Sequence, residues 1–177
     1  MYVGYRHYEK VGSKPLFSFG HGLSYTSFRL SELEISQPFK DLNNIKEESL
    51  EIIVTIENVG SRSGTETILV YISPPVTSSV GRPVRELKGF NKVTLQADES
   101  KNIRITVPIC LATSFWDESI AEWMSEAGEY AVSIVGTGKG NSISAPFAIS
   151  KSRSWTGLYM PVVEGFSVPK VNGTTSS

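Results

Sequence analysis

The sequence is poor in the residues that build metal centres and disulfide frameworks. Its 177 residues include a single cysteine, Cys110, and two histidines, His7 and His21. One cysteine cannot close a disulfide within the chain, and a zinc site takes three or four Cys, His or carboxylate ligands at recognisable spacing. We therefore expect no metal and no cofactor, and we interpret Cys110 as a buried thiol at the end of an apolar strand.

An excess of charge of one sign and long apolar runs are also absent. The 17 Lys and Arg residues are dispersed and balanced by 18 Asp and Glu residues. Nucleic acids and anionic membranes bind clustered Lys and Arg, so we expect neither as a partner. No run approaches the ~20 apolar residues of a transmembrane helix. The opening residues, MYVGYRHYEKVG, have no apolar core, so we expect no signal peptide in this chain.

The motifs of common enzymes are missing as well. No Gly-x-Ser-x-Gly elbow occurs, and Gly20-His21-Gly22 lacks the third glycine and the following helix of a dinucleotide site. Five carboxylates do cluster in one segment: Asp117, Glu118, Glu122, Glu126 and Glu129. Glycoside hydrolysis needs two carboxylates that face each other across a cleft, ~5–9.5 Å apart. A small sandwich provides no such cleft here, so we interpret the cluster as a solvated rim and predict no catalytic residue.

Period-two alternation is what the sequence has in quantity. Leu50, Ile52, Val54 and Ile56 fall on one face of an extended chain, which is typical of a half-buried strand. Similar runs between turn residues indicate seven strands: 28–36, 50–58, 66–73, 87–96, 101–108, 129–136 and 144–150. The pattern predicts an all-β fold, an immunoglobulin-like or fibronectin type III-like antiparallel β-sandwich. Residues 114–128 fit either a turn of helix or an irregular hairpin across one end.

Two tryptophans in that segment allow two interpretations. Trp116 and Trp123 could form a platform on which a sugar ring stacks, or they could pack into the core and contact a partner. We favour packing and contacts, because the neighbouring Phe115 and Met124 are equally apolar.

The segment PLFSFGHGLSYTSF, residues 15–28, is too aromatic for a solvated loop and too rich in glycine for a strand or helix. It holds four large rings with two glycines and a histidine between them: Phe17, Phe19, Gly20, His21, Gly22, Tyr25 and Phe28. Glycine permits positive φ or close backbone approach. We predict that the segment lies extended across a packed surface and is anchored by its rings.

The pattern divides the chain into three parts. Residues 1–26 are predicted to be a linker, 27–150 the sandwich, and 151–177 a tail that Trp155 and Tyr159 tether before it becomes disordered. The tail contains an N-glycosylation sequon at Asn172, which is usable only if the chain is secreted.

Several motifs together resemble one family. They are YVGYRHYE (2–9), PLFSFGHGLSYTSF (15–28), ENVGSRSGTETILVYIS (57–73), RPVRELKGFNKVTLQADES (82–100) and SFWDESIAEWMSEAGEYAVSIVGTG (114–138). In this order and spacing they resemble the C-terminal region of glycoside hydrolase family 3 β-glucosidases, with fungal members most similar. Ser18 departs from the proline that is common in the family.

The resemblance implies an accessory fibronectin type III-like domain of a retaining β-glucosidase, inactive alone. The family places its nucleophilic aspartate in a (β/α)₈ barrel and the acid/base usually in the following domain, and no position here matches either motif. The implied partners are these catalytic domains, docked on the linker rings, with β-glucosides met through the parent enzyme. The full-length parent is implied to be secreted, and we expect this chain to be a truncated product. The alternatives are a carbohydrate-binding module that uses exposed aromatic residues and an independent adhesion domain.

Overall fold

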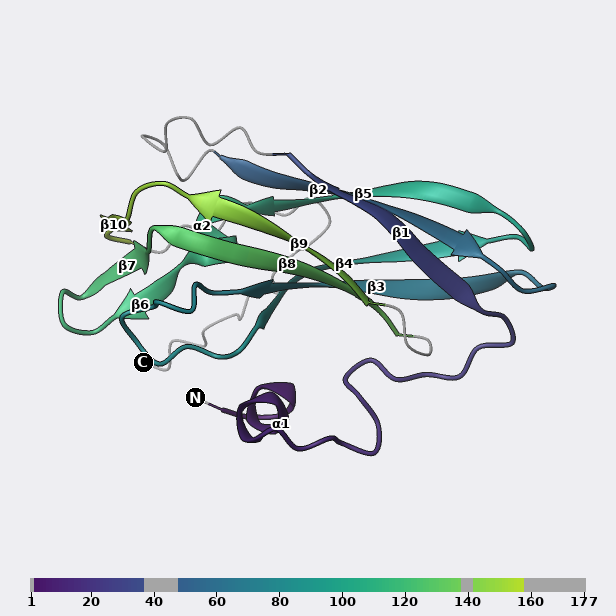
Figure 1. The fold of residues 1–177 in the computed structure, drawn as a ribbon, viewed down its shortest axis with the longest axis horizontal. Coiled ribbons are helices and arrows are strands. Elements are labelled where there is room, and N and C mark those ends of the chain that lie inside the picture. The colour runs from purple at the N-terminus through teal and green to yellow at the C-terminus, as the bar shows by residue number, and fades with distance from the viewer. Residues whose placement is uncertain (1, 37–47, 138–141, 158–177) are drawn as a thin grey trace, which may run out of the picture.

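Alternating apolar and polar residues build two antiparallel sheets that face each other (Figure 1). The computed structural model describes residues 2–36, 48–137 and 142–157. One sheet has the order β1-β2-β5, from β1 (Phe28–Ile35), β2 (Ser49–Asn58) and β5 (Ser100–Pro108). The other has the order β4-β3-β8-β9, from β4 (Glu86–Leu95), β3 (Gly64–Ser73), β8 (Gly128–Gly136) and β9 (Ser142–Ile149). These seven strands confirm the predicted sandwich.

The core lies between the two sheets, where the alternation directs the side chains. Leu50, Ile52, Val54 and Ile56 of β2 are fully buried, and their neighbours along the strand are half-buried. The rings of Tyr130 and Phe147 stack at 5.4 Å in the same core. Burying one such side chain contributes about 1.5–3 kcal/mol, so the predicted apolar face supplies most of the driving force for folding.

A third, small sheet closes one end of the sandwich. Helix α2 (Ile109–Thr113) leads into β6 (Phe115–Asp117), which forms a hairpin with β7 (Glu122–Ser125). Strand β10 (Arg153–Trp155) pairs with the other edge of β7. Of the two alternatives for 114–128, the hairpin is therefore confirmed. Trp155 packs against the core, as the predicted tether requires.

The linker begins with a short helix, α1 (Tyr5–Val11), which was not predicted from the sequence. Helix α1 ends at Gly12, whose left-handed φ of 67° lets the last carbonyl groups accept hydrogen bonds from Gly12 and Ser13. Tyr159, the disordered end of the tail and the Asn172 sequon lie outside the described residues.

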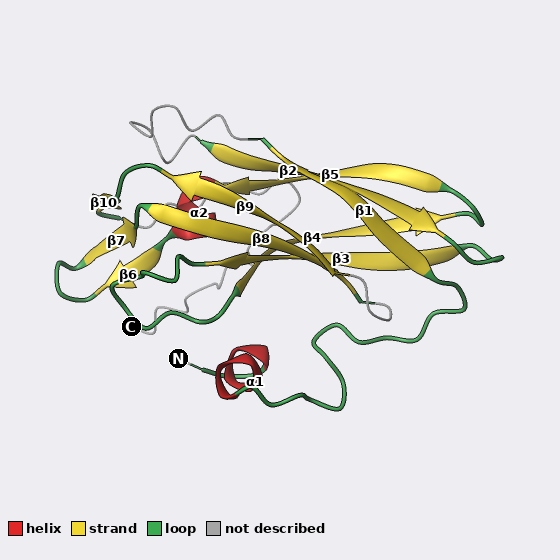
Figure 2. Cartoon of the chain, viewed as in Figure 1, coloured by secondary structure: helices red, strands yellow, loops and turns green. Residues whose placement is uncertain are grey.

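Figure 2 shows helix α1 outside the sandwich, joined to β1 by a long loop. Within the described ranges, no helix combines the length and the apolar character that crossing a bilayer takes.

Candidate domain-docking surface

The N-terminal residues cross the outer side of the sandwich instead of joining a sheet (Figure 2). They consist of α1 followed by the strap, which is the irregular segment of residues 13–27. The strap forms neither a helix nor a strand, in line with its composition, and α1 lies within the predicted linker of residues 1–26. Contacts with α1 and with the sandwich hold the strap in place, and several of its large apolar side chains are exposed to solvent.

Helix α1 is fastened to the start of β4 by polar contacts. The Arg6 guanidinium lies 2.8 Å from Glu86 Oε1, and Glu9 Oε1 lies 2.6 Å from Arg85 Nη2. The backbone N–H of Leu87 donates to the Tyr5 hydroxyl at 2.9 Å. Three contacts on one side of a seven-residue helix explain how it persists without a buried residue of its own.

Aromatic rings continue this attachment into the strap. The Tyr5 ring meets Tyr71 of β3 edge-on at 5.5 Å and Phe19 of the strap at 5.8 Å. The Arg85 guanidinium lies 4.3 Å from the centre of the Tyr71 ring. Phe19 therefore uses one side of its ring to hold the strap against α1.

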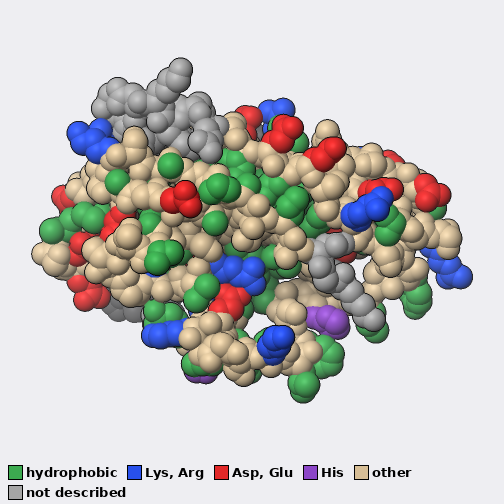
Figure 3. Space-filling model, in the orientation of Figure 1, with side chains coloured by type: hydrophobic (Ala, Val, Ile, Leu, Met, Phe, Trp, Pro, Cys, Tyr) green, Lys and Arg blue, Asp and Glu red, His purple; other side chains and the backbone are tan. Residues whose placement is uncertain are grey.

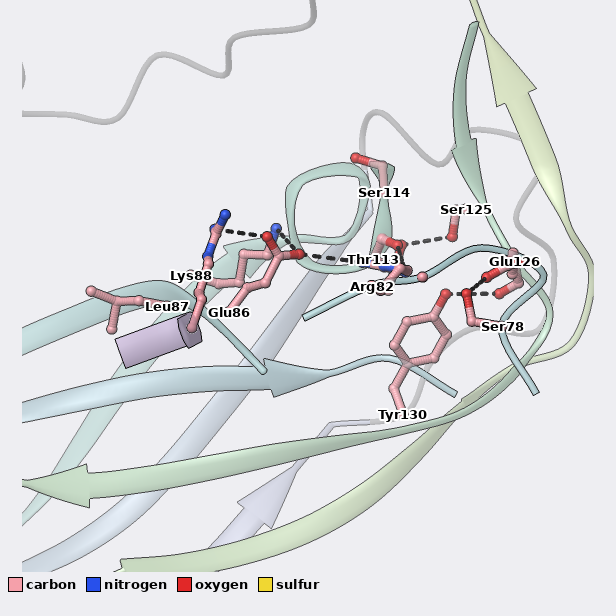
Figure 4. Close-up of polar contacts among 12 residues, drawn as sticks. Ser78, Arg82, Glu86, Leu87, Lys88, Thr113, Ser114, Ser125, Glu126 and Tyr130 are labelled. Atoms are coloured by element: carbon pink, nitrogen blue, oxygen red, sulfur yellow. Dashed lines mark hydrogen bonds and ion pairs between the residues drawn. The ribbon is translucent and has the colours of Figure 1, made fainter. Parts of the chain in front are cut away.

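Arg82 holds the loop between β3 and β4 that α1 rests on (Figure 4). Its side chain is 5% exposed, donates from Nη1 to the Thr113 carbonyl at 2.9 Å and lies 3.4 Å from Glu86 Oε2. Burial pushes the pKa of the Glu86 carboxyl upward, but the positive charges of Lys88, Arg6 and Arg82 lower it overall. The carboxylate thus stays ionised between three cations and links α1, β4 and the Arg82 loop.

The middle of the strap touches the sandwich at Gly20. Its φ is +80°, and a Cβ there would lie 2.8 Å from Thr137 Cγ2 and 3.2 Å from Leu69 Cδ1. This confirms the prediction for Gly20, which needs both a left-handed conformation and a close approach. Gly22 needs neither, because its surroundings are open and its φ is not left-handed.

The end of the strap is fixed by Asn58, which is fully buried. The Thr26 hydroxyl and the Gly60 N–H both donate to Asn58 Oδ1. On the other side, Asn58 Nδ2 donates to the carbonyls of Arg62, Leu95 and Gln96. Every polar atom of this side chain is used, so it joins the strap to two turns of the sandwich.

The strap nevertheless exposes large apolar side chains. Leu16, Leu23 and Tyr25 are 97%, 96% and 92% exposed, and Phe17 and Phe19 are more than half exposed. Figure 3 shows apolar side chains along the lower rim, where the N-terminal residues run, next to basic side chains. The strap is thus a fixed ridge with uncovered apolar groups.

Of the two other residues predicted for this surface, Phe28 lies outside the strap and His21 lies on it. Phe28 begins β1 and packs against the core, so it belongs to the sandwich and not to the outward ridge. His21 is exposed, and its ring lies 5.1 Å from that of Phe17.

The tryptophans lie on the small sheet at the other end. Trp116, Trp123 and Trp155 are paired in register across β6, β7 and β10, so all three share one face. Trp116 and Trp123 meet edge-on at 5.7 Å, and Trp155 packs on the core. Only Trp116 is exposed, at 47%, so the three rings do not present a flat stacking platform.

The nearby carboxylates are occupied by local hydrogen bonds. The Ser119 hydroxyl and N–H donate to Asp117, and these bonds lower the pKa of Asp117. Glu126 accepts from the hydroxyls of Ser78 and Ser79, both at 2.6 Å. A general acid needs a raised pKa, so Asp117 is unsuited to that role.

Comparisons with known proteins place this geometry in a family. Residues 66–137 match the model of the fibronectin type III-like domain. Probable β-glucosidase J of Neosartorya fischeri is 53% identical over 159 residues, which are 89% of this chain and 18% of that protein. The Kluyveromyces marxianus β-glucosidase in complex with glucose has a TM-score of 0.75 and 38% identity, covering 89% of this chain and 18% of that one. A GH3 β-glucosidase of Bifidobacterium adolescentis has a TM-score of 0.74 and 29% identity, covering 94% and 23%.

The chain belongs with the fibronectin type III-like domains of glycoside hydrolase family 3 β-glucosidases. This confirms the resemblance drawn from the motifs, and the similar curated proteins include fungal β-glucosidases, as that resemblance predicted. The chain spans about a fifth of the length of the β-glucosidases that it matches. It corresponds to a non-catalytic region of them.

Sequence reasoning missed the contacts that hold the fibronectin type III-like domain to its own linker. Tyr5, Arg6 and Glu9 followed by Gly12 form a weak helix-and-stop signal that could have indicated α1. No local pattern indicates Arg82 or Asn58, because most of their partners lie tens of residues away.

Proposed function

We propose that this domain is a domain-docking module of a retaining β-glucosidase and is inactive alone. The observation that carries the proposal is the row of exposed apolar side chains on a strap that is fixed at both ends. Monomeric proteins rarely leave such a group uncovered, and patches of this kind mark contact sites. Of the docking residues predicted from the sequence, those that remain in this role are Phe17, Phe19, Gly20, His21, Gly22 and Tyr25.

The proposed occupant of the ridge is the catalytic part of the same polypeptide. The relatives are about five times longer than the matched region, and a covalently attached partner has an effective concentration in the millimolar range. Burying one leucine or aromatic ring contributes about 1.5–3 kcal/mol. Because the strap is already ordered by Gly20 and Asn58, docking loses little conformational entropy on this side.

The chemistry of the proposed parent would lie outside this domain. Hydrolysis of terminal non-reducing β-D-glucosyl residues requires a nucleophile and an acid/base, which the family resemblance assigns to the other domains. β-Glucosides would meet this chain only through the parent enzyme. Secretion of the full-length protein, which the resemblance implies, belongs to the same proposal.

A full-length chimera tests the docking role. In it, this chain replaces the matching region of Neosartorya fischeri β-glucosidase J, and hydrolysis of an aryl β-glucoside shows that the catalytic part is folded. Limited proteolysis then compares Leu16→Ser/Leu23→Ser with the control Ile120→Ser, which changes an exposed residue between β6 and β7.

We expect the double strap variant to release the domain at least tenfold faster, because each lost contact removes about 1.5–3 kcal/mol of docking energy. Release at the same rate from the strap variant and the control would contradict the proposal.

The alternative of a carbohydrate-binding module finds no support in the geometry. It needs several exposed rings in one plane, and Trp116 is the one exposed ring of the Trp116–Trp123 pair.

A further inference from the structure

The loop between β3 and β4 carries a second set of exposed apolar side chains. Val76, Val80 and Val84 are exposed, with Val76 fully in solvent. These valines lie in an irregular segment, residues 74–85, that no sheet requires to be apolar. A solvated loop would ordinarily be polar at such positions.

This loop lies beside the start of the described chain. The Tyr2 hydroxyl donates to the Gly81 carbonyl at 3.2 Å, and Glu9 pairs with Arg85 at 2.6 Å. Residues on both sides of Val84 are thus in contact with the segment of residues 2–11. Val3, Tyr8 and Val11 of that segment are also exposed, so exposed apolar side chains occur on the loop, on the helix and on the strap.

The loop is held as firmly as the strap. Arg82 anchors it to the Thr113 carbonyl and to Glu86, and the hydroxyls of Ser78 and Ser79 donate to Glu126 (Figure 4). A loop fixed in this way presents its valines in one arrangement, which lowers the entropic cost of contact.

We propose that residues 76–84 form a second contact area for the catalytic part of the same polypeptide, next to the segment of residues 2–11. The inference rests on the proposed docking function and extends it. A domain that precedes Tyr2 would be attached to this chain beside Gly81, because the Tyr2 hydroxyl donates to the Gly81 carbonyl. The partner surface is apolar, and it contacts Val80 and Val84 in addition to the strap.

Photocrosslinking in the full-length chimera tests this inference. A benzoylphenylalanine is placed at position 80 in the loop, at position 17 in the strap, or at position 106 as the control. Thr106 is exposed on β5, in the other sheet of the sandwich. Mass spectrometry then identifies crosslinked peptides that join this domain to the catalytic part.

We expect crosslinks from positions 17 and 80 and at least tenfold fewer from position 106. Crosslinks from position 17 alone would overturn the loop inference and leave the docking function standing. No excess over the control at either position would overturn both. Val80→Ser/Val84→Ser provides a second measurement: it should speed proteolytic release of the domain severalfold while the unfolding temperature of the isolated chain stays unchanged.

Discussion

Replacing Asn58 with alanine should destabilise the domain and loosen its strap at the same time. The substitution removes a side chain that accepts from Thr26 and Gly60 and donates to three backbone carbonyls. Each buried polar group that is left unpaired costs about 1–3 kcal/mol. With water reaching some of these groups, we expect a loss of about 3–5 kcal/mol in the free energy of unfolding.

The matched variant Thr26→Val removes only the link to the strap. It should cost about 1 kcal/mol, because the Asn58 bonds to the sandwich remain. Urea unfolding of the isolated chain measures both values. At about 2–4 °C per kcal/mol, the melting temperature should fall by about 6–20 °C for Asn58→Ala and by a few degrees for Thr26→Val. Equal losses in the two variants would refute the assignment of Asn58 as the residue that joins strap and turns.

Three further predictions concern the strap, the charge network and the catalytic role. Gly20→Ala should destabilise the chain by about 1–3 kcal/mol, while Gly22→Ala should be near neutral, because of these two glycines only Gly20 has a positive φ and a close neighbour. The urea midpoints of the two variants measure the difference. The pKa of Glu86 is lower in the folded chain than in the unfolded chain, so the ionised carboxylate stabilises the fold above the unfolded-state pKa. This stabilisation is lost as the pH falls through the folded-state pKa. Below about pH 4.5 the melting temperature should therefore drop more steeply for the native chain than for Glu86→Gln. The isolated chain should not hydrolyse an aryl β-glucoside, and turnover that Asp117→Asn abolishes would overturn its non-catalytic assignment.

The main strands follow from local sequence, and the linker contacts do not. Alternation over eight to ten residues, as in β2, fixes which face is buried and hence the strand. Strands of three or four residues, such as β6 and β7, are too short to show a period. Helix α1 has no buried residue and depends on ion pairs with residues about 80 positions away, which no local pattern encodes.

The proposed docking surface was predictable only in part, for the same reason. Composition indicated that the strap is neither a helix nor a strand, because aromatic residues lie beside glycines, but it did not distinguish Gly20 from Gly22. Phe28 belongs to the sandwich because the first strand begins at that residue. The polar anchors Arg82 and Asn58 became visible only once the fold had brought their partners together.

Hydroxyl-radical footprinting tests the central claim most directly, by comparing this chain alone with the same chain inside the full-length chimera. Tyr25 is almost completely exposed in the isolated domain, and Phe17 is largely exposed. If the strap docks on the catalytic part, oxidation of both should fall at least tenfold in the chimera, while half-exposed Trp116 serves as an internal reference and keeps its rate. Unchanged oxidation of Phe17 and Tyr25 would contradict the account.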